Sequence, residues 1–136
     1  MSFPFDALRR APDVEGPGLV AADAADRLLL DESRSVREEC GPNELTVIGD
    51  AYGALALGAA WEGARGIRVH QDVLTGEQAI EANAERADLR GAIAVHPELD
   101  ADVVQGARVV LLRLPRSRDA LRDIAGLIAA HAAPDV

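Results

Sequence analysis

Four short aliphatic runs alternate with longer segments of helical periodicity, and this alternation leaves few possible folds. The runs lie at 45–49, 67–71, 92–95 and 108–114. Strands that alternate with helices form βαβ units, in which the strands are parallel and the crossovers are right-handed. We therefore predict an α/β fold with a mostly parallel sheet in the order 3-2-1-4. Any ligand is expected to bind beyond the carboxyl ends of the strands.

Local signals place the helices and divide the chain. Thr75 and Gln78 have the spacing of a capping box, which predicts a helix that begins there. Ser117 is expected to cap the last helix, whose apolar residues recur at helical spacing. Residues 1–18 are rich in proline and glycine and are expected to form an amino-terminal arm. This leaves residues 19–136 as the α/β domain.

The fourth aliphatic run, RVVLLRL at 108–114, is apolar on both faces. Such a strand is typical of the middle of a parallel sheet. As the last strand in the predicted order it would instead lie on an open edge, where apolar strands pair readily with other chains. We therefore expect the domain to be truncated after its fourth strand and helix, with a further strand or a partner covering this edge.

Composition favours a soluble cytoplasmic protein without a membrane partner. No apolar run approaches the roughly 20 residues of a membrane span. The first residues, MSFPFDALRRAPD, contain acid and proline too early for a signal peptide. A single cysteine, Cys40, excludes an internal disulfide and suits a reducing compartment.

The charge of the chain argues against strong binding to nucleic acid by this domain alone. The formal net charge is −9, and all 14 basic residues are arginine. Phosphate backbones attract basic proteins and repel acidic ones. A role on RNA would therefore require a local arginine patch or another domain.

The turn after the first predicted strand reads Gly49-Asp50-Ala51-Tyr52-Gly53. In a parallel sheet this position offers backbone amides and a helix amino terminus to anionic ligands. Glycines are needed there because side chains prevent close approach of the ligand. Only Gly49 and Gly53 meet that need, so the segment is either a cofactor loop or a structural turn.

Three stretches carry a resemblance that covers nearly the whole chain. They are FDALRRAPDVEGPGLVAADAADRLLLDE (5–32), VIGDAYGAL (47–55) and VVLLRLPRSRDAL (109–121). With them the chain resembles the Rossmann-like class I S-adenosylmethionine-dependent methyltransferases. It is most similar to the amino-terminal half of the ribosomal RNA guanine-N2 methyltransferases, which have two tandem methyltransferase-like domains. The resemblance implies that this half is non-catalytic and that the carboxy-terminal domain binds S-adenosylmethionine and transfers the methyl group.

The cofactor signatures of the family are incomplete in this chain. A strand-1 acid would fall at Val47, and the three loop glycines would fall at Gly49, Ala51 and Gly53. Asp50 is expected either to cap the next helix or to repel the carboxylate of the methionine moiety. A ribose-binding acid would be Asp72. The cofactor-binding candidates are thus Gly49, Asp50, Gly53 and Asp72, a degenerate set that is expected to bind no cofactor.

The catalytic signature is replaced. The resemblance implies Asn/Asp-Pro-Pro-aromatic after strand 4, where this chain has Arg113-Leu114-Pro115-Arg116. Guanidinium groups only donate hydrogen bonds, so they cannot accept one from an exocyclic amine. No catalytic residue is therefore predicted.

Four arginines gather near the end of the fourth strand. Because arginine binds phosphate through two hydrogen bonds, the cluster is a candidate RNA contact. The alternative is that it pairs with acids such as Asp119 and Asp123. The candidates are Arg113, Arg116, Arg118 and Arg122.

Other site chemistry is sparse. Three scattered histidines and Cys40 give no metal-ligand spacing, so no metal site is predicted. The aromatic residues Phe3, Phe5, Tyr52 and Trp61 are too few and too dispersed to predict a stacking platform for single-stranded RNA. Trp61 is expected in the core.

The sequence is consistent with three functions. The first is a non-catalytic domain that packs against a catalytic methyltransferase domain and positions ribosomal RNA, with S-adenosylmethionine bound by the parent enzyme. The second is a small stand-alone methyltransferase that binds S-adenosylmethionine or a nucleotide. The third is a module that forms a homodimer through strand 108–114. Affinity for S-adenosylmethionine distinguishes the second function, and mass in solution distinguishes the third.

Overall fold

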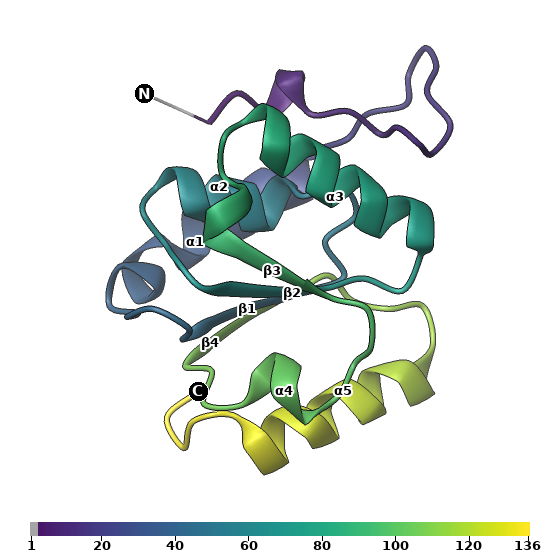
Figure 1. Ribbon diagram of the computed structural model, residues 1–136. Coiled ribbons are helices and arrows are strands. Elements are labelled where there is room, and N and C mark those ends of the chain that lie inside the picture. Colours follow the sequence, from purple (N-terminus) through teal and green to yellow (C-terminus); the bar gives the residue numbers. More distant parts are fainter. Residues whose placement is uncertain (1–2) are drawn as a thin grey trace.

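The four predicted strands form one parallel sheet with helices on both faces (Figure 1). A computed structural model describes residues 3–136. The strands are β1 (Leu45–Ile48), β2 (Ile67–His70), β3 (Ile93–His96) and β4 (Val109–Leu112). Their order is β3-β2-β1-β4, and every neighbouring pair is parallel. The predicted Rossmann-like architecture and strand order are therefore confirmed.

Five α-helices in the described part of the chain complete three layers. The helices α1 to α3 cover one face of the sheet, and α4 and α5 cover the other (Figure 1). Two short 3₁₀ helices, η1 in the amino-terminal arm and η2 before β3, complete the element order. The bounds are η1 Phe5–Ala7, α1 Ala24–Glu38, α2 Ala54–Trp61, α3 Leu74–Arg86, η2 Arg90–Ala92, α4 Ala101–Val104 and α5 Arg118–His131.

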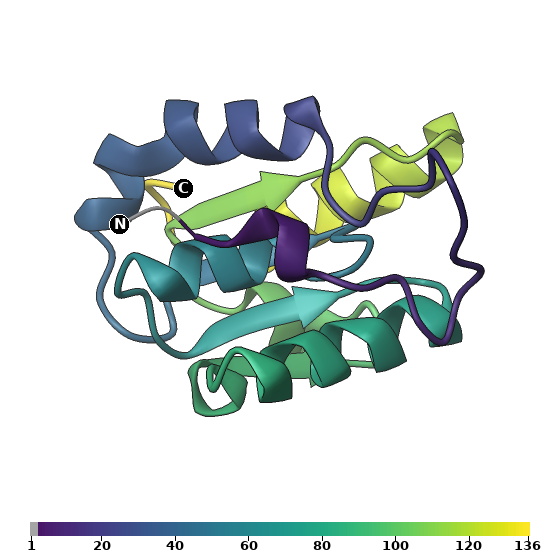
Figure 2. The same cartoon turned by 90° about the horizontal axis from the view of Figure 1, so that it is seen from above.

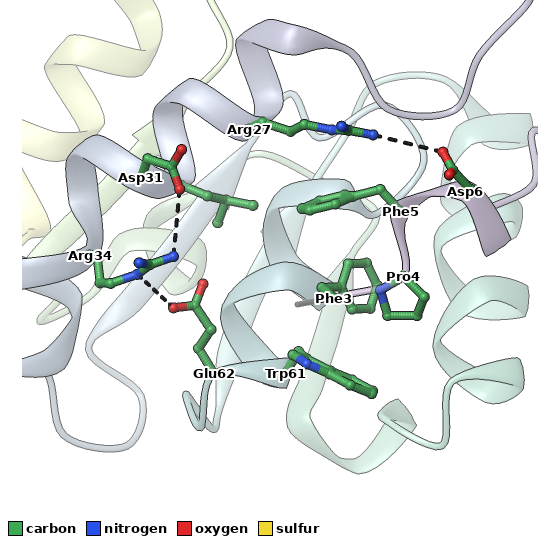
Figure 3. A pocket seen from close by; sticks show the side chains of 10 residues that line it. Phe3, Pro4, Phe5, Asp6, Arg27, Asp31, Arg34, Trp61 and Glu62 are labelled. Atoms are coloured by element: carbon green, nitrogen blue, oxygen red, sulfur yellow. Dashed lines mark hydrogen bonds and ion pairs between the residues drawn. The ribbon is translucent and has the colours of Figure 1, made fainter. Parts of the chain in front are cut away.

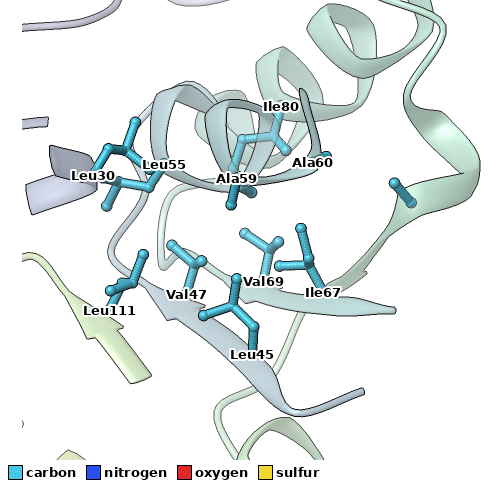
Figure 4. Packing of buried hydrophobic residues seen from close by; sticks show 12 residues of the cluster. Leu30, Leu45, Val47, Leu55, Ala59, Ala60, Ile67, Val69, Ile80 and Leu111 are labelled. Carbon is cyan, nitrogen blue, oxygen red and sulfur yellow. The ribbon is translucent and has the colours of Figure 1, made fainter. Parts of the chain in front are cut away.

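The main core lies between the sheet and α2 (Figure 4). All four residues of β1 are buried, and so are residues 54–60 of α2. A helix that is apolar on every side is stable in water only when it is enclosed. A smaller cluster on the opposite face joins Ile48 to Val103, Val104 and Ile124.

The helix amino termini follow the local signals in part. Ser117 caps α5, since its side chain accepts a hydrogen bond from the Ala120 N–H at 3.0 Å. The predicted capping box at Thr75 is wrong, because α3 begins at Leu74 and its N-cap is Val73, which has no capping side chain. The Gln71 side-chain carbonyl instead accepts a hydrogen bond from the Val73 N–H.

Strand β4 lies on one edge of the sheet and pairs only with β1 among the described strands. Val109 and Arg113 donate backbone hydrogen bonds toward the β1 side, to Glu44 at 3.1 Å and Ile48 at 3.0 Å. Because alternate residues of a strand point their amides to opposite sides, the amides of Val110 and Leu112 face outward. No helix within residues 3–136 has the length and apolar character needed to cross a membrane.

Candidate functional site

The loop after β1 is packed against the loop after β4, at the end of the sheet where a Rossmann-like fold binds ligands. Gly49 has a φ of +82°, in the left-handed region that favours glycine. A Cβ atom on Gly49 would lie 2.9 Å from the backbone oxygen of Arg113. Glycine is thus required at position 49 by contact between two loops of the chain itself.

Asp50 occupies the amino terminus of α2. Its carboxylate accepts hydrogen bonds from the backbone N–H groups of Leu55 at 3.2 Å and Ala56 at 2.9 Å. The N-cap residue Gly53, with a φ of +102°, has no side chain to do so. Asp50 is fully buried, and burial raises the pKa of its carboxyl group to about 6. The helix amino terminus, which would attract a ligand anion, is therefore already satisfied by Asp50.

The amino-terminal arm runs along the carboxyl ends of the strands before it enters α1 (Figure 2). The Tyr52 hydroxyl donates to the Asp13 carboxylate at 2.5 Å, and the Arg10 guanidinium lies 5.0 Å from the Tyr52 ring centroid. Buried Asn83 exchanges two hydrogen bonds with the backbone of Arg9, both at 2.9 Å. These contacts hold the arm against the loop that follows β1.

Arg113 joins the loop after β4 to the start of α1. Its guanidinium donates to the Asp23 carboxylate at 3.1 and 3.2 Å and also to Asp26. Asp23 and Asp26 in turn form the capping box of α1. Arg113 is thus engaged within the fold, although its position in the sequence made it an RNA-contact candidate.

The other three candidate arginines, Arg116, Arg118 and Arg122, are exposed. None of them forms an ion pair with another residue in the range 3–136, Asp119 and Asp123 included. All three lie beyond the carboxyl end of β4, on the loop and in the first turns of α5. Their guanidinium groups are open to solvent on the same end of the sheet as the arm.

Asp72 follows β2 and is exposed, as a ribose-binding acid would need to be. One of its oxygens lies 2.8 Å from Nε2 of buried His70. The other ring nitrogen of His70 lies 2.9 Å from the backbone oxygen of His96. Asp72 therefore extends a hydrogen-bonded link between the ends of β2 and β3.

Comparison with protein families gives a match over nearly the whole chain. The family described as "RLMG N-terminal domain" matches residues 2–136. The chain belongs to the RLMG N-terminal domain family. It is accordingly an amino-terminal domain of a ribosomal RNA methyltransferase, and the two-domain organisation implies a carboxy-terminal catalytic domain. A comparison with curated protein sequences gave no significant match.

A solved structure supports the fold of this RLMG N-terminal domain. The chain is similar to precorrin 8W decarboxylase from Methanobacterium thermoautotrophicum, with 18% sequence identity and a TM-score of 0.68. The alignment covers 98% of this chain and 68% of the decarboxylase chain. At this identity the likeness concerns the α/β fold alone.

A hollow in this RLMG N-terminal domain lies between the arm, α1 and the end of α2 (Figure 3). Phe3, Phe5 and Trp61 line it together. The prediction that Trp61 is a core residue is wrong, since 36% of it is exposed at the rim of this hollow. No linear pattern indicated the cluster, because positions 3 and 61 meet only after α2 packs under the arm.

The described residues contain no group of three His, Cys, Asp or Glu side chains placed to hold a metal ion. The four sequence-predicted cofactor residues are also not gathered around an open space. Gly49 and Asp50 are packed against the chain itself, whereas Asp72 faces solvent. The carboxyl end of the sheet is therefore built as a packed surface.

Proposed function

We propose that this chain is the non-catalytic amino-terminal domain of an S-adenosylmethionine-dependent ribosomal RNA (guanine-N2) methyltransferase. It packs against the catalytic domain and helps to orient the RNA. The observation that carries the proposal is the packed carboxyl end of the sheet, where Asp50 accepts hydrogen bonds from backbone N–H groups at the start of α2 and the arm is bonded to Tyr52.

The residues present do not fit S-adenosylmethionine. The carboxylate of its methionine moiety would approach the amino terminus of α2, where the buried Asp50 carboxylate already accepts the free N–H groups. Two like charges this close repel each other strongly in a buried site. After β4, the side chains of Arg113 and Arg116 supply only hydrogen-bond donors, so no side chain at these two positions accepts a hydrogen bond from a base amine. We therefore assign no chemical step to this domain.

The RNA role rests on the three exposed arginines beyond β4. Arg116, Arg118 and Arg122 lie within seven positions and have no ion-pair partner among the described residues. Exposed guanidinium groups donate bidentate hydrogen bonds to phosphate oxygens and position a backbone without reading its sequence. In a domain of net charge −9, such a patch directs RNA to one end of the molecule.

Changing Arg116 and Arg118 to glutamate in the full-length methyltransferase is expected to weaken RNA binding about tenfold or more. The slope of log affinity against log salt should also fall by about 1 to 2, since each lost phosphate contact removes about one released counterion. The matched control replaces Arg65 and Arg90, two exposed arginines at the opposite end of the sheet, by glutamate. Equal effects of the two double variants on affinity would assign the loss to overall charge and remove the RNA role of this patch.

A homodimer through β4 is the second candidate, and the open edge of that strand favours it. The outward amides of Val110 and Leu112 have no partner strand within residues 3–136, and the strand is only partly buried. Two copies that pair along this edge would satisfy those amides. A mass of one chain in solution, measured by light scattering, would remove this candidate.

A further inference from the structure

The outer side of β4 presents backbone groups that have no partner strand within residues 3–136. The amides of Val109 and Arg113 donate toward β1, so those of Val110 and Leu112 point away from the sheet. Natural edge strands are usually blunted by a charged residue, a proline or a bulge. Strand β4 reads Val-Val-Leu-Leu and contains no charged residue and no proline. It therefore has the sequence of an inner strand in the position of an edge strand.

The α1 side of this edge is apolar. Seen from above, α1 lies along the outer margin of the sheet, next to β4 (Figure 2). Arg34 points toward α2, where it pairs with Glu62 at 2.9 Å. Leu29 and Val36 are seven positions apart and share the flank of α1 that is turned away from α2. Leu29 is partly buried against the main core and Val36 is 49% exposed, so this apolar flank overhangs the edge of β4.

The opposite face of the edge is apolar as well. The side chains of Val110 and Leu112 pack with Ile124 in the smaller core cluster, to which α5 adds Leu127 and Ile128. Of these five residues only Ile124 is buried, and the other four are partly buried. Both layers of the core thus reach the edge of β4 and end in partly buried side chains. One more strand would cover them.

The last residues of the chain lie at the start of this edge. The Ala133 N–H donates to the Ala107 backbone oxygen at 2.9 Å, and Asp135 pairs with Arg108 at 3.1 Å. Helix α5 therefore brings the chain back from the carboxyl end of β4 to its amino end (Figure 1). A strand that began here would run parallel to β4.

The face on which α5 lies determines where such a strand fits. The crossovers β1-α2-β2 and β2-α3-β3 step toward one edge of the sheet, with their helices on the face that α1 to α3 cover. A step in the opposite direction is right-handed only when its helix lies on the other face. Helix α5 follows β4 on that other face (Figure 1). The right-handed position for the next parallel strand is therefore outside β4, beside Val110 and Leu112.

We propose that the outer edge of β4 is the docking surface for the part of the parent methyltransferase that follows Val136, which adds a strand parallel to β4. This strand would pair with the outward backbone groups of Val110 and Leu112, and its side chains would alternately cover the α1 flank and the α5 face. Five residues follow α5, and loops between a helix and a strand have about 2 to 6, so the strand would begin close to Val136. The inference rests on the proposed function, which makes this chain a domain of a longer protein.

Hydrogen exchange of the Val110 and Leu112 amides tests this docking, measured by NMR in the full-length methyltransferase and in the 136-residue chain. Both amides should exchange about 100-fold more slowly, or slower still, in the full-length protein. The outward amides of β3, at the other edge of the sheet, are the control and should exchange alike in both proteins. Equal exchange of the two β4 amides in both proteins would overturn the proposal. Slow exchange in a 136-residue chain that has the mass of two copies would assign the edge to a dimer and would also overturn it.

Substitution on the α1 flank gives a second test. Val36→Glu should speed exchange of the two β4 amides about tenfold in the full-length protein, because it places a charge beneath the docked part. It should leave the unfolding midpoint of the 136-residue chain unchanged, since Val36 is exposed there. Leu28→Glu is the matched control, because Leu28 is 59% exposed on the side of α1 opposite the buried Leu30. Equal exchange rates in the two variants would contradict the docking.

The same measurements separate this inference from the proposed function. Rapid exchange of the β4 amides in a full-length protein that methylates ribosomal RNA would overturn the inference alone. Slow exchange in a full-length protein without methyltransferase activity would overturn the proposed function alone.

Discussion

Replacing Asp50 with asparagine is expected to remove roughly 2 to 3 kcal/mol of pH-dependent stability between about pH 4 and about pH 7. Burial raises the pKa of Asp50 to about 6 in the folded chain, well above the usual value for aspartate. At pH values between the usual aspartate pKa and about 6, Asp50 holds a proton in the folded state that it has released in the unfolded state. This contribution to stability is therefore fully present at low pH and is lost as the pH rises through about 6.

The measurement is urea unfolding of the natural chain and of Asp50→Asn over this pH range. Asp13, Glu15 and Asp23 have lowered pKa values, so they make the unfolding free energy rise with pH where Asp50 makes it fall. These three residues are present in both proteins. The difference in unfolding free energy between the two proteins therefore isolates Asp50. Asp123→Asn controls for removal of one negative charge from the surface. If the unfolding free energies of the natural chain and of Asp50→Asn changed with pH in parallel, this would contradict the burial of a titrating carboxyl group at the amino terminus of α2.

Replacing Gly49 with alanine is expected to destabilise the chain by about 2 to 4 kcal/mol. About 1 kcal/mol comes from the φ of +82°, which alanine adopts poorly, and the rest from overlap with backbone. The added Cβ would lie 2.9 Å from the Arg113 oxygen, and a backbone atom cannot rotate away as a side-chain end can.

Gly18→Ala is the matched control for this experiment. Gly18 has a similar φ of +78°, and beyond its two chain neighbours no residue has an atom within 4 Å of the position of its added Cβ. Its substitution should cost only the conformational part, about 1 kcal/mol. Equal losses of unfolding free energy in the two variants would show that the loops after β1 and β4 do not press against each other. Gly49 would then be available to a ligand.

The layout of the sheet was predictable because its signals are local and repeated. Aliphatic runs separated by helical periodicity predicted the strand order, and Ser117 was correctly identified as a helix cap. The Thr75 capping box failed because α3 begins at Leu74, after the Val73 N–H donates to the Gln71 side chain, which in turn donates to the Ala51 backbone oxygen in the loop after β1. Local capping preferences amount to about 1 kcal/mol and yield readily to such contacts.

The candidate site could be predicted only in part from the sequence. The incomplete glycine pattern indicated a degenerate loop, and helix capping was one of two roles foreseen for Asp50. The partners of Arg113 could not be foreseen, because Asp23 lies 90 positions away in the chain. The aromatic cavity depends in the same way on the arm crossing α2, which no periodicity records.

We propose that the packed carboxyl end of the sheet leaves no room for S-adenosylmethionine. This is tested by isothermal titration of S-adenosylmethionine into the purified chain, with S-adenosylhomocysteine titrated as a control. We predict no heat of binding for either ligand up to about 1 mM. Specific binding in the micromolar range would contradict the claim, since it would require Asp50 and the arm to make way for the cofactor.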